Sequence, residues 1–444
     1  MTHIAFFSGD ITRSGGTENV SIMVANALVA GASGEDASGA PASGANPGIA
    51  NAGIAQSKNP INAPAFDEAP GIEDPVSDAN LGNARSMSAN PAGARMRLSF
   101  VSLFEEADEP FFPIDACIAR HTVYAAPTHG IHHYFGTVRR LRRIVEREHV
   151  DVLVDIDGIL DMYALPLKRA TGVKVVSWEH FNYLQHPGVP YRRLTRRWAA
   201  RRADAIVTLT EADKAMYLRH LTPRCPVIAI PNPMRTPSPA PVYDAASTII
   251  VSSGRLTHQK GFDMLVDVAA RVLPAHPDWC WLILGEGEDR PMLEERIARA
   301  GLDGQLILRG RVDDMDGHYR RAAMFVLTSR FEGLPMVLLE AKAHRLPIVS
   351  FDCATGPAEI VTDGVNGDLT AVGDVEAMAA RINRLIDDAA LRRVYADHAL
   401  DDAARFGMDG ILGQWRALFA RLDGAGADAR GAGADAGPGK DGSR

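Results

Sequence analysis

The sequence predicts an α/β protein with two doubly wound domains, each a parallel β-sheet covered by helices on both faces. Three observations predict this class. Short apolar runs of strand length alternate with longer amphipathic runs of helical period along most of the 444 residues. The short runs are apolar almost throughout, which is typical of parallel strands buried on both faces. These runs fall into two consecutive sets, separated by a proline-rich stretch.

The first set lies in residues 1–30 and 95–235, which we expect to form an N-terminal domain. Its strand-like runs are HIAFF, RLSFVSL, VDVLVDI, VKVVSW, DAIVTLT and PVIAIP. TENVSIMVANAL and GTVRRLRRIVEREH have the helical period. In open parallel sheets, ligands bind beyond the carboxyl ends of the strands, so the loops after these strands are candidate sites.

The second set lies in residues 236–403, the expected C-terminal domain. Its strand-like runs are TIIVSSG, CWLILG, QLILRG, AMFVLTS and LPIVSF. The break between the sets is PNPMRTPSPAPVYD, whose prolines exclude regular structure and suit a hinge. A last helical stretch, residues 404–422, could pack back across the domains.

Two segments have the composition of disordered chain. Residues 31–94 and the tail at 423–444 are dominated by small and polar residues together with proline. They carry too few large apolar side chains to offset the entropy lost on ordering. Because strand-like runs flank the first segment on both sides, we interpret it as an insertion into the N-terminal domain.

Charge and cysteine content exclude several classes of function. The formal net charge of −8 argues against a general nucleic-acid binder, which is usually basic. The four cysteines are widely spaced without a C-x-x-C pair, which favours reduced core residues over disulfides or zinc ligands. The chain shows neither a signal peptide nor an apolar run of transmembrane length. We therefore expect a cytoplasmic protein, at most lying at the inner face of a membrane.

Two loops have the composition of phosphate-binding sites. After the first strand, SGDITRSGGTENV places Gly15 and Gly16 before a helical run, with Thr17 as a candidate cap, and helix N-termini attract anions. In the second set, SSGRLTHQKGFDML places Arg255 and Lys260 five positions apart, and these two cations suit a diphosphate. The alternatives are an ordinary tight turn and a solvated basic loop.

Two glutamates flank an apolar segment in FEGLPMVLLEAKAH. Glu332 is predicted in the turn after a strand and Glu340 in the second turn of the following helix. A buried carboxylate needs hydrogen-bond donors, and the vicinal hydroxyls of a sugar or ribose supply them in pairs. The alternative is one glutamate favoured by the helix dipole and one exposed glutamate.

Several motifs, in this order and spacing, resemble the retaining glycosyltransferase family 4. They are GGTE, GRLTHQKGFDML, LILGEGEDRPMLE and FEGLPMVLLEAKAHRLPIVSFDCATGPAEIVTDGVNGDL, with SWEHFNY supplying His180. The resemblance implies the GT-B fold, in which two Rossmann-like domains face each other across a cleft. It also implies a donor site made by the residues Gly15, Gly16, Arg255, Lys260, Glu332, Gly333, Leu334 and Glu340.

Within that site the resemblance implies individual roles. Arg255 and Lys260 hold the diphosphate, Glu332 contacts the donor sugar, Glu340 contacts the ribose, and His180 lies beside the sugar. Glu332, His180, Arg255 and Lys260 are thus the candidate catalytic residues. The alternative for His180 is a histidine satisfied within its loop.

One motif favours a different chemistry. Asp155-Ile156-Asp157 ends a strand and looks like the D-x-D motif with which GT-A glycosyltransferases hold a divalent metal. Because Arg255 and Lys260 already supply positive charge for a diphosphate, we expect no metal and no cofactor. The nucleotide sugar is then a substrate.

Arginines are concentrated in GVPYRRLTRRWAARRAD. At helical spacing they suggest a face that attracts anionic lipid, the alternative being a solvated face with salt bridges. The candidate membrane contacts are Arg192, Arg193, Arg196, Arg197 and Arg201.

The sequence therefore predicts a retaining, metal-independent glycosyltransferase. It is expected to move a hexose or N-acetylhexosamine from a nucleotide-diphosphate sugar, with UDP favoured, to a hydroxyl of a glycan or lipid-linked acceptor in surface polysaccharide or lipopolysaccharide synthesis. The alternatives are a sugar-nucleotide epimerase of the same shape and a non-catalytic sugar-nucleotide-binding protein.

Overall fold

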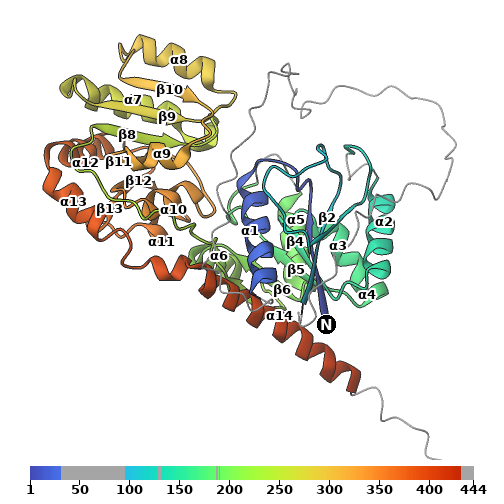
Figure 1. The fold of residues 1–444 in the computed structure, drawn as a ribbon. Coiled ribbons are helices and arrows are strands. Elements are labelled where there is room, and N and C mark those ends of the chain that lie inside the picture. Colours follow the sequence, from blue (N-terminus) through green and yellow to red (C-terminus); the bar gives the residue numbers. More distant parts are fainter. Residues whose placement is uncertain (32–95, 129–132, 187–188, 190, 432–444) are drawn as a thin grey trace, which may run out of the picture.

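The computed structural model describes residues 1–31, 96–128, 133–186, 189 and 191–431, of which 424–431 are described by their backbone alone. The predicted disordered insertion at 31–94 therefore lies outside the described residues except for Gly31, as do residues 432–444 of the tail. The described chain forms two parallel sheets with intervening helices, which confirms the predicted fold class (Figure 1).

The N-terminal sheet has seven strands in the order β3-β2-β1-β4-β5-β6-β7, all paired in parallel. Its strands are β1 (Thr2–Ser8), β2 (Met96–Ser102), β3 (Ala119–Thr122), β4 (Val152–Ile156), β5 (Lys174–Trp178), β6 (Ala205–Thr208) and β7 (Val227–Ala229). Its helices are α1 (Gly16–Ala30), α2 (Tyr134–Arg147), α3 (Asp161–Ala164), α4 (Lys168–Thr171), α5 (Arg192–Arg202) and α6 (Glu211–His220), with a 3-10 turn at Leu165–Leu167.

Successive apolar side chains of β1 point to opposite faces of this sheet, so β1 contributes to a core on each face. Ile4 and Phe6 point into a core shared with Val20 of α1. Ala5 and Phe7 point into a second core on the opposite face, shared with Leu141 of α2. Since successive strand residues point to opposite faces, an almost continuously apolar strand needs a helix layer on each side.

The C-terminal sheet has six parallel strands in the order β10-β9-β8-β11-β12-β13. Its strands are β8 (Ile249–Ser253), β9 (Cys280–Leu284), β10 (Leu306–Gly310), β11 (Met324–Leu327), β12 (Ile348–Asp352) and β13 (Gly367–Ala371). Its helices are α7 (Phe262–Val272), α8 (Arg290–Arg299), α9 (Met315–Arg320), α10 (Met336–Ala343), α11 (Pro357–Ile360), α12 (Val375–Asp387) and α13 (Ala389–Asp397), with 3-10 turns at His258–Lys260, Leu273–Ala275 and Ala403–Phe406.

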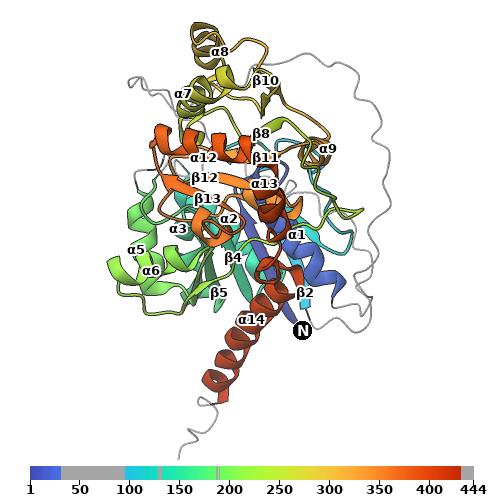
Figure 2. The same cartoon turned by 90° about the vertical axis from the view of Figure 1, so that its left-hand side faces the viewer.

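The last helix, α14 (Met408–Gly431), leaves the C-terminal domain and contacts α1 of the N-terminal domain (Figures 1 and 2). Trp415 of α14 is fully buried, and its ring lies 4.8 Å from that of Trp178 at the end of β5. The predicted end of this helix at residue 422 is wrong, because the helix continues to Gly431. The alanines among residues 424–431 favour helix and offset the cost of the glycines between them.

Two strands were missed by the apolar pattern. β3 has the sequence ARHT and β13 the sequence GDLTA, and neither contains a run of apolar residues. Both are edge strands, so each is paired on one side only and needs less apolar surface than a central strand. Between β7 and β8, the proline-rich segment has neither helix nor strand. Among the described helices, none is long and apolar enough to cross a membrane.

Candidate active site

Lys260 and Glu332 meet where the loops after β8 and β11 come together. The Lys260 ammonium lies 2.6 Å from Oε1 of Glu332, and the Ser329 hydroxyl donates to the same oxygen at 2.6 Å. Gly261 permits this approach, because its φ is +65° and a Cβ there would lie 2.2 Å from the Thr328 carbonyl oxygen. Two residues that are 72 positions apart in sequence thus form one partly buried ion pair.

The backbone around Glu332 is held from both domains. Its carbonyl oxygen accepts a hydrogen bond from the Asn182 side chain at 2.7 Å and another from the Thr355 hydroxyl at 2.6 Å. Asn182 belongs to the N-terminal domain and is buried. A Cβ on Gly333 would lie 2.4 Å from the His180 carbonyl oxygen, so only glycine allows the two domains to approach this closely. The position of Glu332 therefore depends on the domain contact.

His180 lies at this contact with its ring against Trp178, the centroids being 4.6 Å apart. Its Nε2 atom is buried and has no hydrogen-bond partner among the described residues. Burial lowers the pKa of His180 to about 4, against a smaller opposing effect of Glu179. The imidazole is therefore neutral near pH 7, and its unpartnered Nε2 atom is enclosed at the domain contact.

Glu340 lies on α10 and is held by a chain of hydroxyl groups. The Tyr319 hydroxyl donates to Oε2 of Glu340 at 2.7 Å, so the Ser253 hydroxyl, 3.0 Å from Tyr319, must donate to the tyrosine. Burial raises the pKa of Glu340, and the tyrosine hydrogen bond opposes the rise. Oε1 has no hydrogen-bond partner in the described part of the chain, which leaves it for a ligand hydroxyl.

The glycine turn of the N-terminal domain faces Arg255 of the other domain. Burial raises the pKa of Glu18, in the first turn of α1, and the charge of Arg255 partly offsets that rise. A Cβ on Gly15 would lie 2.0 Å from a Glu18 carboxylate oxygen, whereas a Cβ on Gly16 would meet open space. The expected cap at Thr17 is wrong, since the helix begins at Gly16 and Gly15 occupies the N-cap position.

The structure therefore brings some of the predicted site residues into contact and leaves others apart. Lys260 and Glu332 are in contact, Gly333 touches His180, and Glu340 lies on the helix that follows their loop. Arg255 is exposed and has no ion-pair partner among the described residues, so it is free to receive an anion. The side chain of Leu334 is buried in the core, so only its backbone is available to a donor.

Sequence reasoning missed the residues that position these groups. Ser329, Thr355 and Tyr319 are neutral, and their partners are at least three positions away and mostly much farther along the chain. Asn182 lies within the same EHFNY stretch as His180. Its position two residues after the candidate His180 was the one signal for it in the sequence.

Comparisons with known proteins identify the family of the chain. The family model described as glycosyl transferases group 1 matches residues 241–401, and the model described as glycosyltransferase family 4 matches residues 95–236. The chain belongs to the family 4, or group 1, glycosyltransferases. Each domain thus matches its own model, and together they span most of the folded chain.

Individual relatives of the glycosyltransferase agree with this family and fold. An uncharacterized glycosyltransferase of Haemophilus influenzae is 28% identical over 344 residues, covering 77% of this chain and 97% of the relative. Lipopolysaccharide 1,6-galactosyltransferase of Escherichia coli is 26% identical over 266 residues, covering 56% of this chain and 71% of the relative. The crystal structure of Anabaena Alr3699/HepE in complex with UDP-glucose has a TM-score of 0.66 at 16% identity, covering 96% and 100% of the two chains. The fold is GT-B.

The two aspartates of the D-x-D motif in this glycosyltransferase interact with other side chains of the protein. Asp155 is fully buried beside Asp161, and burial raises the pKa of both carboxyl groups, that of Asp161 to about 8. Asp157 pairs with Arg192. In the part of the chain that the structure describes, no three His, Cys, Asp or Glu side chains are grouped as a metal site requires.

The predicted membrane face on α5 needs a correction. Arg192 and Arg196 are only 2% and 1% exposed, and both pair with the buried Glu179, at 3.1 and 2.7 Å. Although burial alone would raise the pKa of Glu179, the two arginines hold it below its ordinary value. Arg193, Arg197 and Arg201 remain exposed. Two of the five predicted lipid contacts are therefore core residues, because a buried carboxylate requires a neutralising partner.

Proposed function

We propose that this glycosyltransferase moves a sugar from a UDP-sugar, or another nucleotide-diphosphate sugar, to a hydroxyl with retention at the anomeric carbon. The observation that carries the proposal is the partly buried Lys260–Glu332 pair at the domain contact. The loop that contains Lys260 also carries the exposed Arg255, which has no ion-pair partner among the described residues. A cation beside a carboxylate suits a substrate that joins an anionic diphosphate to a hydroxyl-rich sugar.

In the proposed mechanism the donor diphosphate approaches Arg255 and Lys260, whose charges stabilise the negative charge that develops as the glycosidic bond breaks. The ammonium of Lys260 then lies between two anions, and Glu332 is free to accept hydroxyl hydrogen bonds from the sugar. The open Oε1 of Glu340 accepts from the ribose. His180, neutral at pH 7, offers its unpartnered nitrogen to the sugar.

The acceptor is proposed to be a glycan or lipid-linked glycan of a surface polysaccharide or lipopolysaccharide, bound by the N-terminal domain. The similarity to the lipopolysaccharide 1,6-galactosyltransferase of Escherichia coli supports this class. Exposed Arg193, Arg197 and Arg201 on α5, with the exposed arginines of α2, provide a positive surface for anionic lipid. No metal is proposed, since the two cations can neutralise a diphosphate.

The proposal is tested by incubating the protein with a panel of nucleotide sugars, with and without a membrane extract as acceptor source. Transfer of sugar only when extract is present supports the proposal. A free epimer formed without extract would identify an epimerase, and donor binding without consumption would identify a sensor. Loss of transfer in EDTA, with recovery in manganese, would contradict the metal-independent mechanism.

A further inference from the structure

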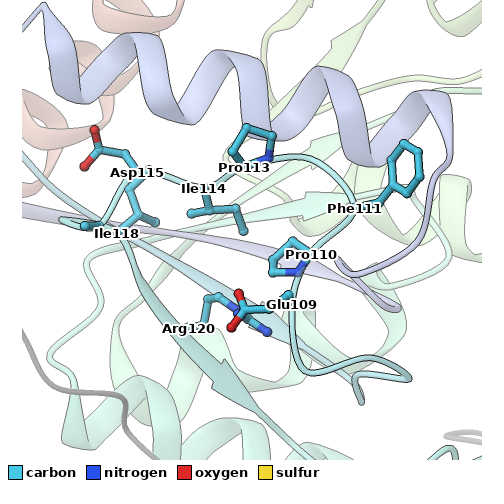
Figure 3. A pocket seen from close by; sticks show the side chains of 9 residues that line it. Glu109, Pro110, Phe111, Pro113, Ile114, Asp115, Ile118 and Arg120 are labelled. Atoms are coloured by element: carbon cyan, nitrogen blue, oxygen red, sulfur yellow. The ribbon is translucent and has the colours of Figure 1, made fainter. Parts of the chain in front are cut away.

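The N-terminal domain contains a hollow beside α1 that the donor site does not use. It is lined by residues 109–111 and 113–116 of the loop between β2 and β3, together with Ile118 and Arg120 (Figure 3). Its volume is about 430 Å³. This volume falls within the range of roughly 300–1,000 Å³ that is typical of small-molecule sites. We call it the loop pocket.

The loop that lines the pocket is hydrogen-bonded at two points to the segment that contains the glycine turn and α1. At one end, the Phe111 amide donates to the Thr12 carbonyl oxygen at 3.2 Å, four residues before Gly16. At the other end, the Asn26 side chain donates to the Pro113 carbonyl oxygen and accepts from the Asp115 amide, both at 2.9 Å. Asn26 lies about 15 Å along the axis of α1 from Gly16, at 1.5 Å per residue. A short oligosaccharide can span that length.

The lining of the loop pocket combines an aromatic ring with acidic groups. Phe111 is 64% exposed, and such a ring can pack against the C–H face of a sugar. Two carboxylates, those of Glu109 and Asp115, also line the pocket, and carboxylate oxygens accept hydrogen bonds from hydroxyl groups.

The two described arginines beside the loop pocket form ion pairs with glutamates. Arg120 pairs with Glu105, and Arg13 pairs with Glu106 at 2.8 Å. Among the described residues, acidic side chains therefore outnumber basic ones around the loop pocket, which favours neutral hydroxyl-bearing ligands and disfavours phosphates and uronic acids.

We propose that the loop pocket binds a neutral sugar of the acceptor, one or more residues away from the sugar that receives the transferred group. The inference rests on the proposed transferase function and assigns the acceptor chemistry of the same protein. The terminal sugar lies near Gly16, and the chain behind it follows α1 to Phe111 and beyond. The loop pocket selects acceptors that are uncharged at this position.

Two variants change the loop pocket without touching the donor site. Phe111→Ala removes the exposed ring, and Ala116→Trp fills the hollow from an exposed position, so neither disturbs the core. Phe135→Ala on α2 is the matched control, since Phe135 is 84% exposed in the same domain and does not line the pocket. In the transfer assay both pocket variants should raise the KM for acceptor by about fivefold or more. The KM for donor should be unchanged.

A second measurement separates this inference from the proposed function. Saturation-transfer NMR is recorded with maltotriose, chitotriose and trigalacturonic acid in the absence of donor. Wild-type protein and Phe135→Ala should give signals with at least one neutral trisaccharide and weaker signals with the uronic acid, and both pocket variants should lose them. No signal from either neutral trisaccharide, or equal signals in the variants, overturns the loop-pocket proposal. Retained pocket binding with no transfer from any donor overturns the transferase proposal alone.

Discussion

At the scale of single residues, the site is defined by how the Glu332 carboxylate is neutralised. Lys260 and Ser329 both contact Oε1, while the backbone carbonyl of the same residue is held by Asn182 and Thr355. Such a residue has little freedom to move. Binding of an anionic donor must therefore reorganise the ammonium of Lys260 rather than the carboxylate.

Replacing Lys260 by alanine should lower kcat by about 10²-fold or more, the effect of removing one group that stabilises transition-state charge. The melting temperature should fall only modestly, because Glu332 keeps the Ser329 hydrogen bond. Steady-state kinetics and thermal melting check both expectations. Lys214→Ala, which removes a half-buried lysine paired with Glu211 on α6, is the control and should leave kcat unchanged. Wild-type turnover in Lys260→Ala would contradict the diphosphate role.

At the scale of elements, α5 presents two kinds of arginine. Arg192 and Arg196 turn inward to Glu179, which also accepts a hydrogen bond from the Tyr217 hydroxyl at 2.9 Å. Arg193 and Arg197, one position later in each case, are exposed. Through Glu179, the buried Arg192 and Arg196 connect α5 to the end of β5 and to α6. The exposed Arg193 and Arg197 contribute positive charge to the outer surface of α5.

The two kinds of arginine should differ sharply in their effect on stability. Arg196→Ala leaves the Glu179 charge buried with one fewer partner and should lower the free energy of unfolding by about 3–5 kcal/mol. Arg197→Ala, the adjacent exposed position, should change it by less than about 0.5 kcal/mol. Urea unfolding followed by the fluorescence of the N-terminal domain measures both. Equal effects would contradict the burial of Arg196.

A second feature at this scale is the carboxyl pair formed by Asp155 of β4 and Asp161 of α3. Burial raises the pKa of Asp161 to about 8, and the Ser177 hydroxyl donates to its carboxyl group at 2.7 Å. The folded protein thus retains a proton that the unfolded chain releases near pH 4. The unfolded state binds fewer protons between these values, so this group's contribution to stability falls as pH rises from about 4 to about 8.

Asp161→Asn should remove that pH dependence. The amide resembles the protonated acid and does not titrate, so the variant lacks the loss of stability that wild type shows as pH rises. The difference in melting temperature, variant minus wild type, should therefore increase between about pH 6 and pH 8 and then level off. Thermal melts across this range test the expectation, with the exposed Asp313→Asn as control. Parallel curves for Asp161→Asn and wild type would show that the pair holds no proton.

At the scale of the whole molecule, the two domains meet through specific polar contacts and through α14. The Glu359 carboxylate of the C-terminal domain accepts hydrogen bonds from the amides of Glu211 and Ala212, at the start of α6. Glu359 is therefore a helix cap supplied by the other domain, where negative charge is favourable. The Asn182–Glu332 hydrogen bond adds a contact that reaches the site itself.

Asn182→Asp should uncouple the site from the domain contact. The substitution replaces an amide donor by a carboxylate oxygen that repels the Glu332 carbonyl, so kcat should fall by about tenfold or more while nucleotide affinity changes little. Turnover measurements and calorimetric titration with UDP separate the two quantities. Asn383→Asp, which changes an asparagine on α12 outside both the donor site and the loop pocket, is the control for kcat. Unchanged kcat in Asn182→Asp would show that Glu332 does not depend on this contact.

Most of the strands and the loops of the candidate site could be predicted from local patterns in the sequence. The period of apolar residues predicted eleven strands that the structure contains, because a strand buried on both faces must be apolar along its length. The glycine turn and the loops bearing Lys260 and Glu332 were also located, since parallel strands place their following loops at one edge of a sheet. The short edge strands β3 and β13 carry no such signal.

The sequence by itself determined the two parallel sheets, the loops that carry the candidate site, and the family motifs within those loops. Only the tertiary structure decided that Lys260 pairs with Glu332, that Asn182 holds that glutamate from the other domain, and that Arg192 and Arg196 are core residues. The physical reason is that the partner of a buried charge is chosen by distance in space. Partners such as Asn182 and Glu332 lie 150 positions apart in the chain, where no local pattern links them.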